Sequence, residues 1–148
     1  MKSIYDKKLS AGVIVRDPVT RLILACFPTG KNKMSADLPK GQCNPKEFAI
    51  DAAVRELYEE TGLAIDKIEL KDLGKYPYVK TKDLHLFYTE REVDLKSLEC
   101  KSMFVNSNDG KMLPEICGYS MIDVDNERWY PALKKVIQKS LSENSLID

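Results

Sequence analysis

Two apolar runs near the start of the chain predict β-structure. β-Branched and apolar residues dominate 9–16 and 21–27, and the DPVT tetrapeptide at 17–20 between them has turn chemistry. We therefore expect an antiparallel hairpin. Residues 28–36 are polar and lack periodicity, which predicts an exposed loop before a short strand at 37–40.

The clearest helical pattern lies between Asn44 and Gly62. Asn44, Pro45 and Glu47 suit the N-cap, first and third positions of a helix, with proline where its missing N–H costs little. Gly62 suits the C-terminal stop. Between these signals, apolar residues recur at three- and four-residue spacing and predict one packing stripe, made of Ile50, Ala53, Val54, Leu57 and Tyr58.

The rest of the chain predicts further strands and a final helix. Segments of β-forming residues predict strands at 68–78, 84–92, 102–105 and 118–124, with a polar turn at 106–111. Residues 131–141 begin with proline and carry apolar residues at helical spacing, so we expect a helix followed by a frayed tail at about 142–148. No repeat or linker interrupts the pattern, which indicates a single α and β domain over 1–148.

Composition narrows the class of protein only modestly. The chain has 148 residues, 23 basic and 23 acidic, so no net basic field favours nucleic acid or an anionic membrane. The cysteines lack the spacing of a zinc site, and we expect reduced thiols at Cys26, Cys43, Cys100 and Cys117. No apolar run approaches the roughly 18 residues of a membrane span, and no signal-peptide pattern is evident, so we expect a cytoplasmic protein.

Three carboxylates share one face of the predicted helix. Glu56, Glu59 and Glu60 fan across a sector of roughly 100°. Like charges at this spacing repel, and the C-terminal end of a helix disfavours anions. Two readings fit this face: a solvated acidic surface in which Arg55 pairs with Glu59, or oxygen ligands for a hard divalent cation such as Mg²⁺ or Mn²⁺.

The surrounding residues favour the second reading. From Gly41 the sequence is GQCNPKEFAIDAAVRELYEETGL, in which Gly41 is followed by five residues, Glu47, seven residues and then RELYEETGL from Arg55 onward, with Gly62 near its end. This segment resembles the Nudix box at every defining position. The resemblance implies an α/β/α sandwich around a mixed β-sheet. It also implies an enzyme that hydrolyses a nucleoside diphosphate linked to another moiety, using Mg²⁺ or Mn²⁺.

The resemblance also implies a role for each charged residue of the box. Glu56 and Glu60 are the core metal ligands, and Glu59 matches a position that binds metal directly or through water. Either Glu59 or Glu60 serves as the general base, and the sequence leaves this choice open. Arg55 orients a neighbouring glutamate, and Glu47 braces the loop near the helix start.

Lys40 gives the one cue to substrate. Its backbone carbonyl matches a further metal ligand, and its side chain can meet a phosphate oxygen. The PKG sequence that contains it is similar to diadenosine tetraphosphate hydrolases and decapping enzymes, which favours a dinucleoside oligophosphate, with ADP-ribose next. An RNA 5′-end or cap hydrolase and a Nudix-like sensor that binds a nucleotide without cutting it remain alternatives. The sequence also leaves open whether the protein forms a homodimer.

Outside the box, the signals are weaker. We expect Glu115 to supply a further acidic metal ligand, in competition with Glu90, Glu92 and Asp109. His85 lies in an alternating segment, where it fits a phosphate contact, an acid or base, or a structural histidine. Several aromatic rings suit either the core or stacking on a base of the substrate, namely Phe27, Tyr76, Tyr78, Phe87 and Tyr119.

Overall fold

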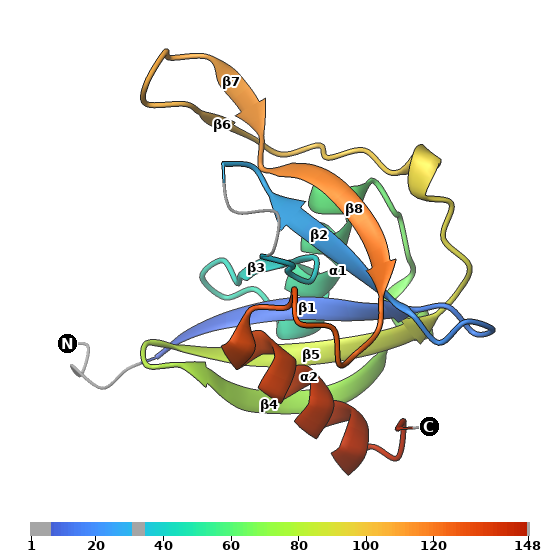
Figure 1. Ribbon diagram of the computed structural model, residues 1–148. Coiled ribbons are helices and arrows are strands. Elements are labelled where there is room, and N and C mark those ends of the chain that lie inside the picture. Colours follow the sequence, from blue (N-terminus) through green and yellow to red (C-terminus); the bar gives the residue numbers. More distant parts are fainter. Residues whose placement is uncertain (1–6, 31–34, 148) are drawn as a thin grey trace.

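The computed structural model describes residues 7–30 and 35–147, and Figure 1 shows the arrangement of their elements. Strands dominate the chain, and a long helix lies in each half. In chain order the elements are β1 (Lys8–Arg16), β2 (Ile23–Pro28), β3 (Lys40–Gln42), α1 (Ala49–Thr61), the 3₁₀ turn η1 (Lys67–Glu69), β4 (Lys71–Val79), β5 (Lys82–Glu90), the 3₁₀ turn η2 (Leu95–Ser97), β6 (Met103–Val105), β7 (Met112–Pro114), β8 (Ile116–Ile122) and α2 (Pro131–Glu143).

The main sheet is mixed. Its order is β4-β5-β1-β2-β8, and the short β3 also pairs with β1. The β1–β5 pair is parallel, whereas the other pairs of this sheet are antiparallel. Strands β6 and β7 form a separate two-stranded hairpin, which projects from the body of the molecule (Figure 1). This arrangement confirms the predicted mixed sheet.

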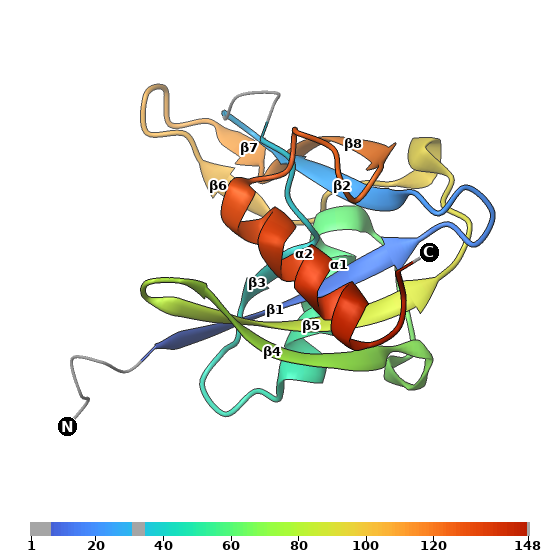
Figure 2. The ribbon, with the colours of Figure 1, turned by 60° about the horizontal axis from the view of Figure 1, so that its bottom comes forward.

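The two long helices cover opposite faces of the sheet. Alternate side chains of a strand point to opposite faces, and in β1 Ile14 joins the core cluster that contains α2 residues, whereas Val13 and Val15 join the cluster that contains α1 residues. Figure 2 shows α2 across the near face with α1 beyond the sheet. The layers therefore form the expected α/β/α sandwich.

The predicted hairpin at the start of the chain is confirmed. β1 and β2 pair antiparallel at Arg16 and Ile23. Asp17 makes the turn, because its Oδ1 accepts hydrogen bonds of 2.8 Å from the main-chain N–H groups of Val19 and Thr20. The turn between the two strands thus depends on the local chemistry of a single aspartate.

The predicted start of the first helix was wrong. α1 begins at Ala49, its N-cap is Phe48, and no side chain caps it. Glu47 does reach back to the main-chain N–H of Asn44, at 2.9 Å, as in a capping box. However, Lys46 has a φ of 65°, in the left-handed region, and a helix cannot run through it. The capping signal therefore shapes a turn before the helix.

Several other elements differ from prediction, and β5 (Lys82–Glu90) and β8 (Ile116–Ile122) each begin and end two residues earlier than the strands expected at 84–92 and 118–124. Asp66 caps a 3₁₀ turn at Lys67–Glu69, so the strand expected from 68 starts at Lys71. The strand expected at 37–40 is an isolated bridge between Cys26 and Asp37 followed by β3, and β7 was not predicted. Residues 31–34 of the predicted loop lie outside the described residues.

The C-terminal helix and the residues after it pack on the sheet. The described end of the chain is tied back, since Arg16 Nη1 donates to the main-chain carbonyl of Leu146 at 2.7 Å. None of the helices in the described part of the chain has the length and apolar character needed to cross a membrane.

Candidate active site

The predicted box folds into one site where β3 meets α1. The Glu56 carboxylate lies against Gly41 so closely that a Cβ atom at Gly41 would stand 2.2 Å from Glu56 Cδ. Four residues along the helix, Glu60 Oε1 accepts a hydrogen bond of 3.2 Å from the main-chain N–H of Lys40. A glycine at position 41 is thus a steric requirement of the site.

Two carboxylates of the helix, those of Glu56 and Glu60, face the protein rather than water. Glu56 is 9% and Glu60 7% exposed, whereas Tyr58, which was expected in the apolar stripe, is 45% exposed. The buried face of α1 is therefore rotated from the predicted one, because the carboxylates pack on β3. Burial of two like charges without solvent is costly unless a cation compensates them.

Arg55 holds three glutamates together. Its Nε and Nη2 donate to the two oxygens of Glu47, at 3.0 and 2.9 Å, and its Nη1 donates to Glu56 Oε1 at 2.8 Å and Glu59 Oε2 at 3.2 Å. Nη2 also donates to the carbonyl of Gln42 at 3.1 Å. Arg55 thus links the loop that carries Glu47 to two glutamates of the helix.

Hydrogen bonding to Arg55 lowers the pKa of the Glu47 carboxyl. The pKa of Arg55 is raised, chiefly by its hydrogen bonds to Glu47 and, in addition, by Glu56. The guanidinium therefore stays charged and fixes the loop before α1 to the helix.

The two buried carboxylates resist ionisation. Burial, followed by the nearby charges of Asp37 and Glu56, raises the pKa of Glu60 to about 9. Burial also raises the pKa of Glu56, and the charges of Glu59 and Glu115 add to this shift while Arg55 opposes it. The site thus has an excess of negative charge that a proton or a cation can neutralise.

The donor chemistry fits a hard divalent cation. Glu56, Glu59 and Glu60 offer carboxylate oxygens, the ligands that Mg²⁺ and Mn²⁺ prefer. Within the residues that the structure describes, however, no three His, Cys, Asp or Glu side chains are grouped closely enough to hold a metal ion. The guanidinium of Arg55 lies between Glu56 and Glu59 and pairs with both.

Lys40 lies at the rim of this site. Its Nζ stands 3.3 Å from Asp37 Oδ2 and 5.4 Å from the centre of the Tyr78 ring. Burial would lower the pKa of Lys40, but the charges of Asp37 and Tyr78 outweigh it, and the pKa is raised. The predicted phosphate-binding ammonium therefore stays charged, paired with a carboxylate and packed on an aromatic ring.

Sequence analysis did not single out Arg128, which the structure places beside Phe27. The guanidinium carbon stands 4.3 Å from the centre of the Phe27 ring. Main-chain bonds bring the two residues together, since Cys26 N–H donates to the Asp37 carbonyl at 2.7 Å and Ala36 N–H to the Arg128 carbonyl at 2.7 Å. No sequence signal predicts these pairings, because they join single residues from three distant segments.

Two of the predicted substrate-binding residues have structural partners. Tyr76 is buried in the core under α2, and its hydroxyl donates to the carbonyl of Leu73 at 3.0 Å. His85 Nε2 is 2.6 Å from Asp72 Oδ1, and its ring stacks on Phe87 with centroids 4.7 Å apart. The structure brings neither of these side chains into hydrogen-bond contact with the box.

The metal-binding role expected of Glu115 stays a prediction. Glu115 is exposed, between β7 and β8, and its negative charge contributes to the raised pKa of Glu56. Its competitor Glu90 is engaged elsewhere, with the Tyr88 hydroxyl at 2.6 Å and Arg21 Nη1 at 3.2 Å. The other two competitors, Glu92 and Asp109, are both exposed.

The C-terminal end of α1 is closed by Gly62 and Tyr119. Gly62 has the predicted left-handed conformation, with φ 78°, and its N–H donates to the carbonyl of Tyr58 at 2.8 Å. The sequence left Tyr119 open between the core and stacking on a base, and its hydroxyl donates to the main-chain carbonyl of Glu60. Burial, followed by the neighbouring Cys26, raises the pKa of Tyr119, so the hydroxyl keeps its proton.

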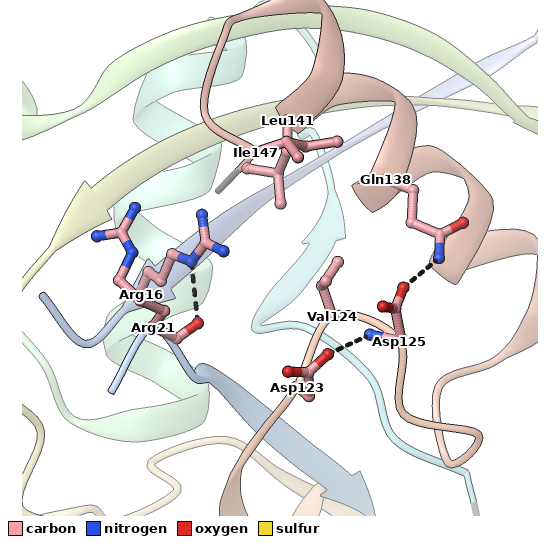
Figure 3. Close-up of a pocket in the computed structure, with 8 residues that line it drawn as sticks. All are labelled: Arg16, Arg21, Asp123, Val124, Asp125, Gln138, Leu141 and Ile147. Atoms are coloured by element: carbon pink, nitrogen blue, oxygen red, sulfur yellow. Dashed lines mark hydrogen bonds between the residues drawn. The ribbon is translucent and has the colours of Figure 1, made fainter. Parts of the chain in front are cut away.

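A separate cavity of about 400 Å³ lies on the α2 side of the molecule (Figure 3). Figure 3 shows Arg16 and Arg21 on one side, with Asp123 and Asp125 across from them. Its polar groups bind one another, since Arg16 Nε donates to the Arg21 carbonyl at 3.0 Å and Gln138 Nε2 to Asp125 Oδ1 at 3.0 Å. None of the residues that line it belongs to the predicted site.

Comparisons with known proteins agree with the geometry of the box. A family model described as NUDIX domain matches residues 6–139. The chain is also 36% identical over 131 residues to an uncharacterized 17.7 kDa protein from the e-segB intergenic region of Enterobacteria phage T4, a match that covers 82% of this chain and 86% of the phage protein.

Solved structures share the fold at low sequence identity. The MutT protein from Methanosarcina mazei Go1 has a TM-score of 0.65 at 16% identity, over 97% of this chain and 99% of that one. A C. elegans Ap4A hydrolase, solved as a binary complex, has a TM-score of 0.62 at 15% identity, over 93% and 99% of the two chains. At these identities the similarity concerns the fold.

Proposed function

Because the chain belongs to the NUDIX family, we propose that it is a divalent-metal-dependent pyrophosphohydrolase that acts on a nucleoside diphosphate linked to another moiety. One observation carries the proposal. Glu56 and Glu60 are buried side by side on α1, in contact with Gly41 and Lys40, and burial raises the pKa of both carboxyls, which favours the binding of a proton or a cation. A buried pair of this kind is unfavourable in a protein selected for stability alone.

In this proposal some residues of the site bind the metal and others hold those ligands in position. Glu56 and Glu60 would hold the cation, with Glu59, which is more exposed, completing the ligand set. When bound, a divalent cation screens the charge of a pyrophosphate group and lowers the pKa of water. Arg55 fixes the ligands, because its guanidinium contacts Glu47, Glu56 and Glu59 at once.

A dinucleoside oligophosphate such as diadenosine tetraphosphate is the substrate class we favour. Lys40 adds positive charge beside the acidic site and packs on the Tyr78 ring, and the guanidinium of Arg128 packs on the Phe27 ring. Rings of this kind suit stacking on a nucleobase while the cations attract the phosphates. ADP-ribose also offers a base and a pyrophosphate and is the second candidate.

The proposal is tested by product analysis. The purified protein is incubated with diadenosine tetraphosphate, ADP-ribose, dGTP and capped RNA, each with Mg²⁺ or with EDTA, and the products are separated by chromatography. We expect Mg²⁺-dependent cleavage at a pyrophosphate bond, fastest for diadenosine tetraphosphate. A preference for ADP-ribose would overturn the substrate class but not the reaction. Nucleotide binding without cleavage would overturn the reaction and favour a sensor.

A matched pair of variants assigns the activity to the site. Glu60→Gln keeps the size of the side chain and its hydrogen-bond acceptor for Lys40 but removes the charge that holds a cation. Asp51→Asn removes a carboxylate from the first turn of the same helix, where Asp51 contacts Lys67 at 3.5 Å. We expect Glu60→Gln to lose most turnover and Asp51→Asn to retain it. Equal turnover in both variants would exclude this site.

A further inference from the structure

The last turn of α1 carries glutamates at the end of a helix where negative charge is unfavourable. The final carbonyl groups of a helix lack partners within the helix, and their aligned dipoles repel anions. Glu59 and Glu60 occupy this turn, and no basic residue accompanies them. Without other donors, repulsion between the carbonyls and the carboxylates would favour fraying at the point where the site needs rigidity.

Donors from other segments close this turn. Main-chain N–H groups before the β6–β7 hairpin bind two of the carbonyls: Lys101 and Ser102 donate to Glu59, at 2.6 and 3.1 Å, and Glu99 donates to Thr61 at 3.0 Å. The carbonyl between them, that of Glu60, accepts a side-chain hydroxyl instead, from Tyr119. The turn that carries the carboxylates is therefore held from outside the helix.

Tyr119 is anchored in the main sheet. It lies on β8 opposite Cys26 of β2, and its ring packs against the core cluster beneath α1. The Tyr119 hydroxyl thus fixes the backbone of Glu60 relative to β8. The side chain of the same glutamate is fixed separately, by the Lys40 N–H of β3. Two contacts from the sheet define where the carboxylate lies.

We propose that Tyr119 is a positioning residue, whose hydroxyl holds the Glu60 backbone so that the Glu60 carboxylate stays at the β3–α1 junction in the orientation that binds the cation. The inference rests on the proposed function for its effect on catalysis, although the positioning itself does not. Small displacements of a ligand or reacting group lower rates steeply. A hydroxyl that only completes a helix end would instead affect stability alone.

Tyr119→Phe is the test, because it keeps the ring and removes only the hydroxyl. Tyr88→Phe is the matched control: Tyr88 is buried where Tyr119 is partly buried, and its hydroxyl likewise donates to a glutamate, Glu90, at 2.6 Å, at the end of β5. Three measurements are made on the full chain. They are amide hydrogen exchange at Lys40 without metal, Mn²⁺ affinity by electron paramagnetic resonance, and kcat and KM for the nucleotide that the wild type cleaves.

We expect Tyr119→Phe to speed exchange of the Lys40 amide about tenfold, because the carboxylate that it bonds is no longer held in place. Mn²⁺ affinity and kcat should each fall about tenfold, with KM within about twofold. Tyr88→Phe should leave all three unchanged. The thermal midpoints of the two variants should be similar, which separates positioning from loss of stability.

Two results would overturn the inference. One is unchanged Lys40 exchange and Mn²⁺ affinity in Tyr119→Phe, and the other is a loss that Tyr88→Phe shares. The proposed function fails in a different way. If the wild type neither binds Mn²⁺ nor hydrolyses any nucleotide, and Tyr119→Phe still unprotects the Lys40 amide, the positioning contact is established and the enzymatic role is not.

Discussion

The main-chain N–H of Lys40 donates a hydrogen bond of 3.2 Å to Glu60 Oε1, across twenty residues of sequence. This bond joins β3 to the last turn of α1. It brings Lys40 next to Glu60, the carboxyl whose pKa burial raises to about 9. The same junction brings Gly41 against Glu56. The acidic helix therefore works as part of a strand–helix junction, and several predictions test this.

Gly41→Ala should disable the site. An added Cβ would stand 2.2 to 2.5 Å from the carboxylate atoms of Glu56, closer than atoms can approach, so Glu56 or β3 must move. We expect hydrolysis to fall at least about tenfold, and stability to fall by about 1–3 kcal/mol from the overpacking. Gly118→Ala is the control, since its Cβ would meet only Phe27 at 3.8 Å. Steady-state kinetics and urea unfolding measure both effects.

Glu60→Gln should change how stability depends on pH. The pKa of Glu60 rises from 4.5 to about 9 on folding, so between these values the folded metal-free protein binds a proton that the unfolded chain releases. The free energy of unfolding therefore falls as pH rises through this window. The Gln variant lacks this loss and should gain stability relative to the wild type toward pH 9.

The measurement is urea unfolding in EDTA at several pH values between 5 and 9, with Asp51→Asn as the control. The difference in free energy between Glu60→Gln and the wild type should grow with pH. Asp51→Asn should follow the wild type, because Asp51 is partly exposed on the first turn. Parallel curves for the wild type and Glu60→Gln would show that Glu60 ionises normally in the folded state.

Arg55→Lys should impair catalysis although it keeps the charge. The guanidinium donates to Glu47 through Nε and Nη2 and to both Glu56 and Glu59 through Nη1, and a single ammonium cannot reproduce this fork. We expect turnover to fall about 10- to 100-fold, as for other residues that orient metal ligands. Kinetics at saturating Mg²⁺ would test this, and full activity in the variant would mean that charge alone suffices.

Phe27→Leu should raise KM for an adenosine-containing substrate. Phe27 lies beneath Arg128, with 4.3 Å between the guanidinium carbon and the ring centre, and stacking on a base would be lost with the ring. We expect KM to rise about tenfold with kcat little changed. Phe48→Leu, at an aromatic residue that is 75% exposed at the start of α1, should have no effect. An unchanged KM would contradict a stacking role and leave Phe27 with its packing against the core cluster alone.

The sequence predicted correctly those elements that depend on interactions between residues close together in the chain. The Asp17 turn, the Gly62 stop and most strands follow from hydrogen bonds and apolar periodicity within a few residues. The capping signal at Asn44 misled the prediction, since Glu47 does bond Asn44, but Lys46 adopts a left-handed conformation and delays the helix to Ala49. A local signal can thus be satisfied in a turn as well as in a helix.

The sequence by itself was enough to identify the family of this protein and the residues of its acidic helix. The spacing of Gly41, Glu47, Arg55, Glu56 and Glu60 identifies the family and its acidic site, because that spacing depends on one continuous segment. Only the tertiary structure decided which helix face is buried, that Arg128 meets Phe27, and that the Tyr119 hydroxyl holds Glu60. These features join residues that are far apart in the chain, and packing of the sheet against its helices brings them together.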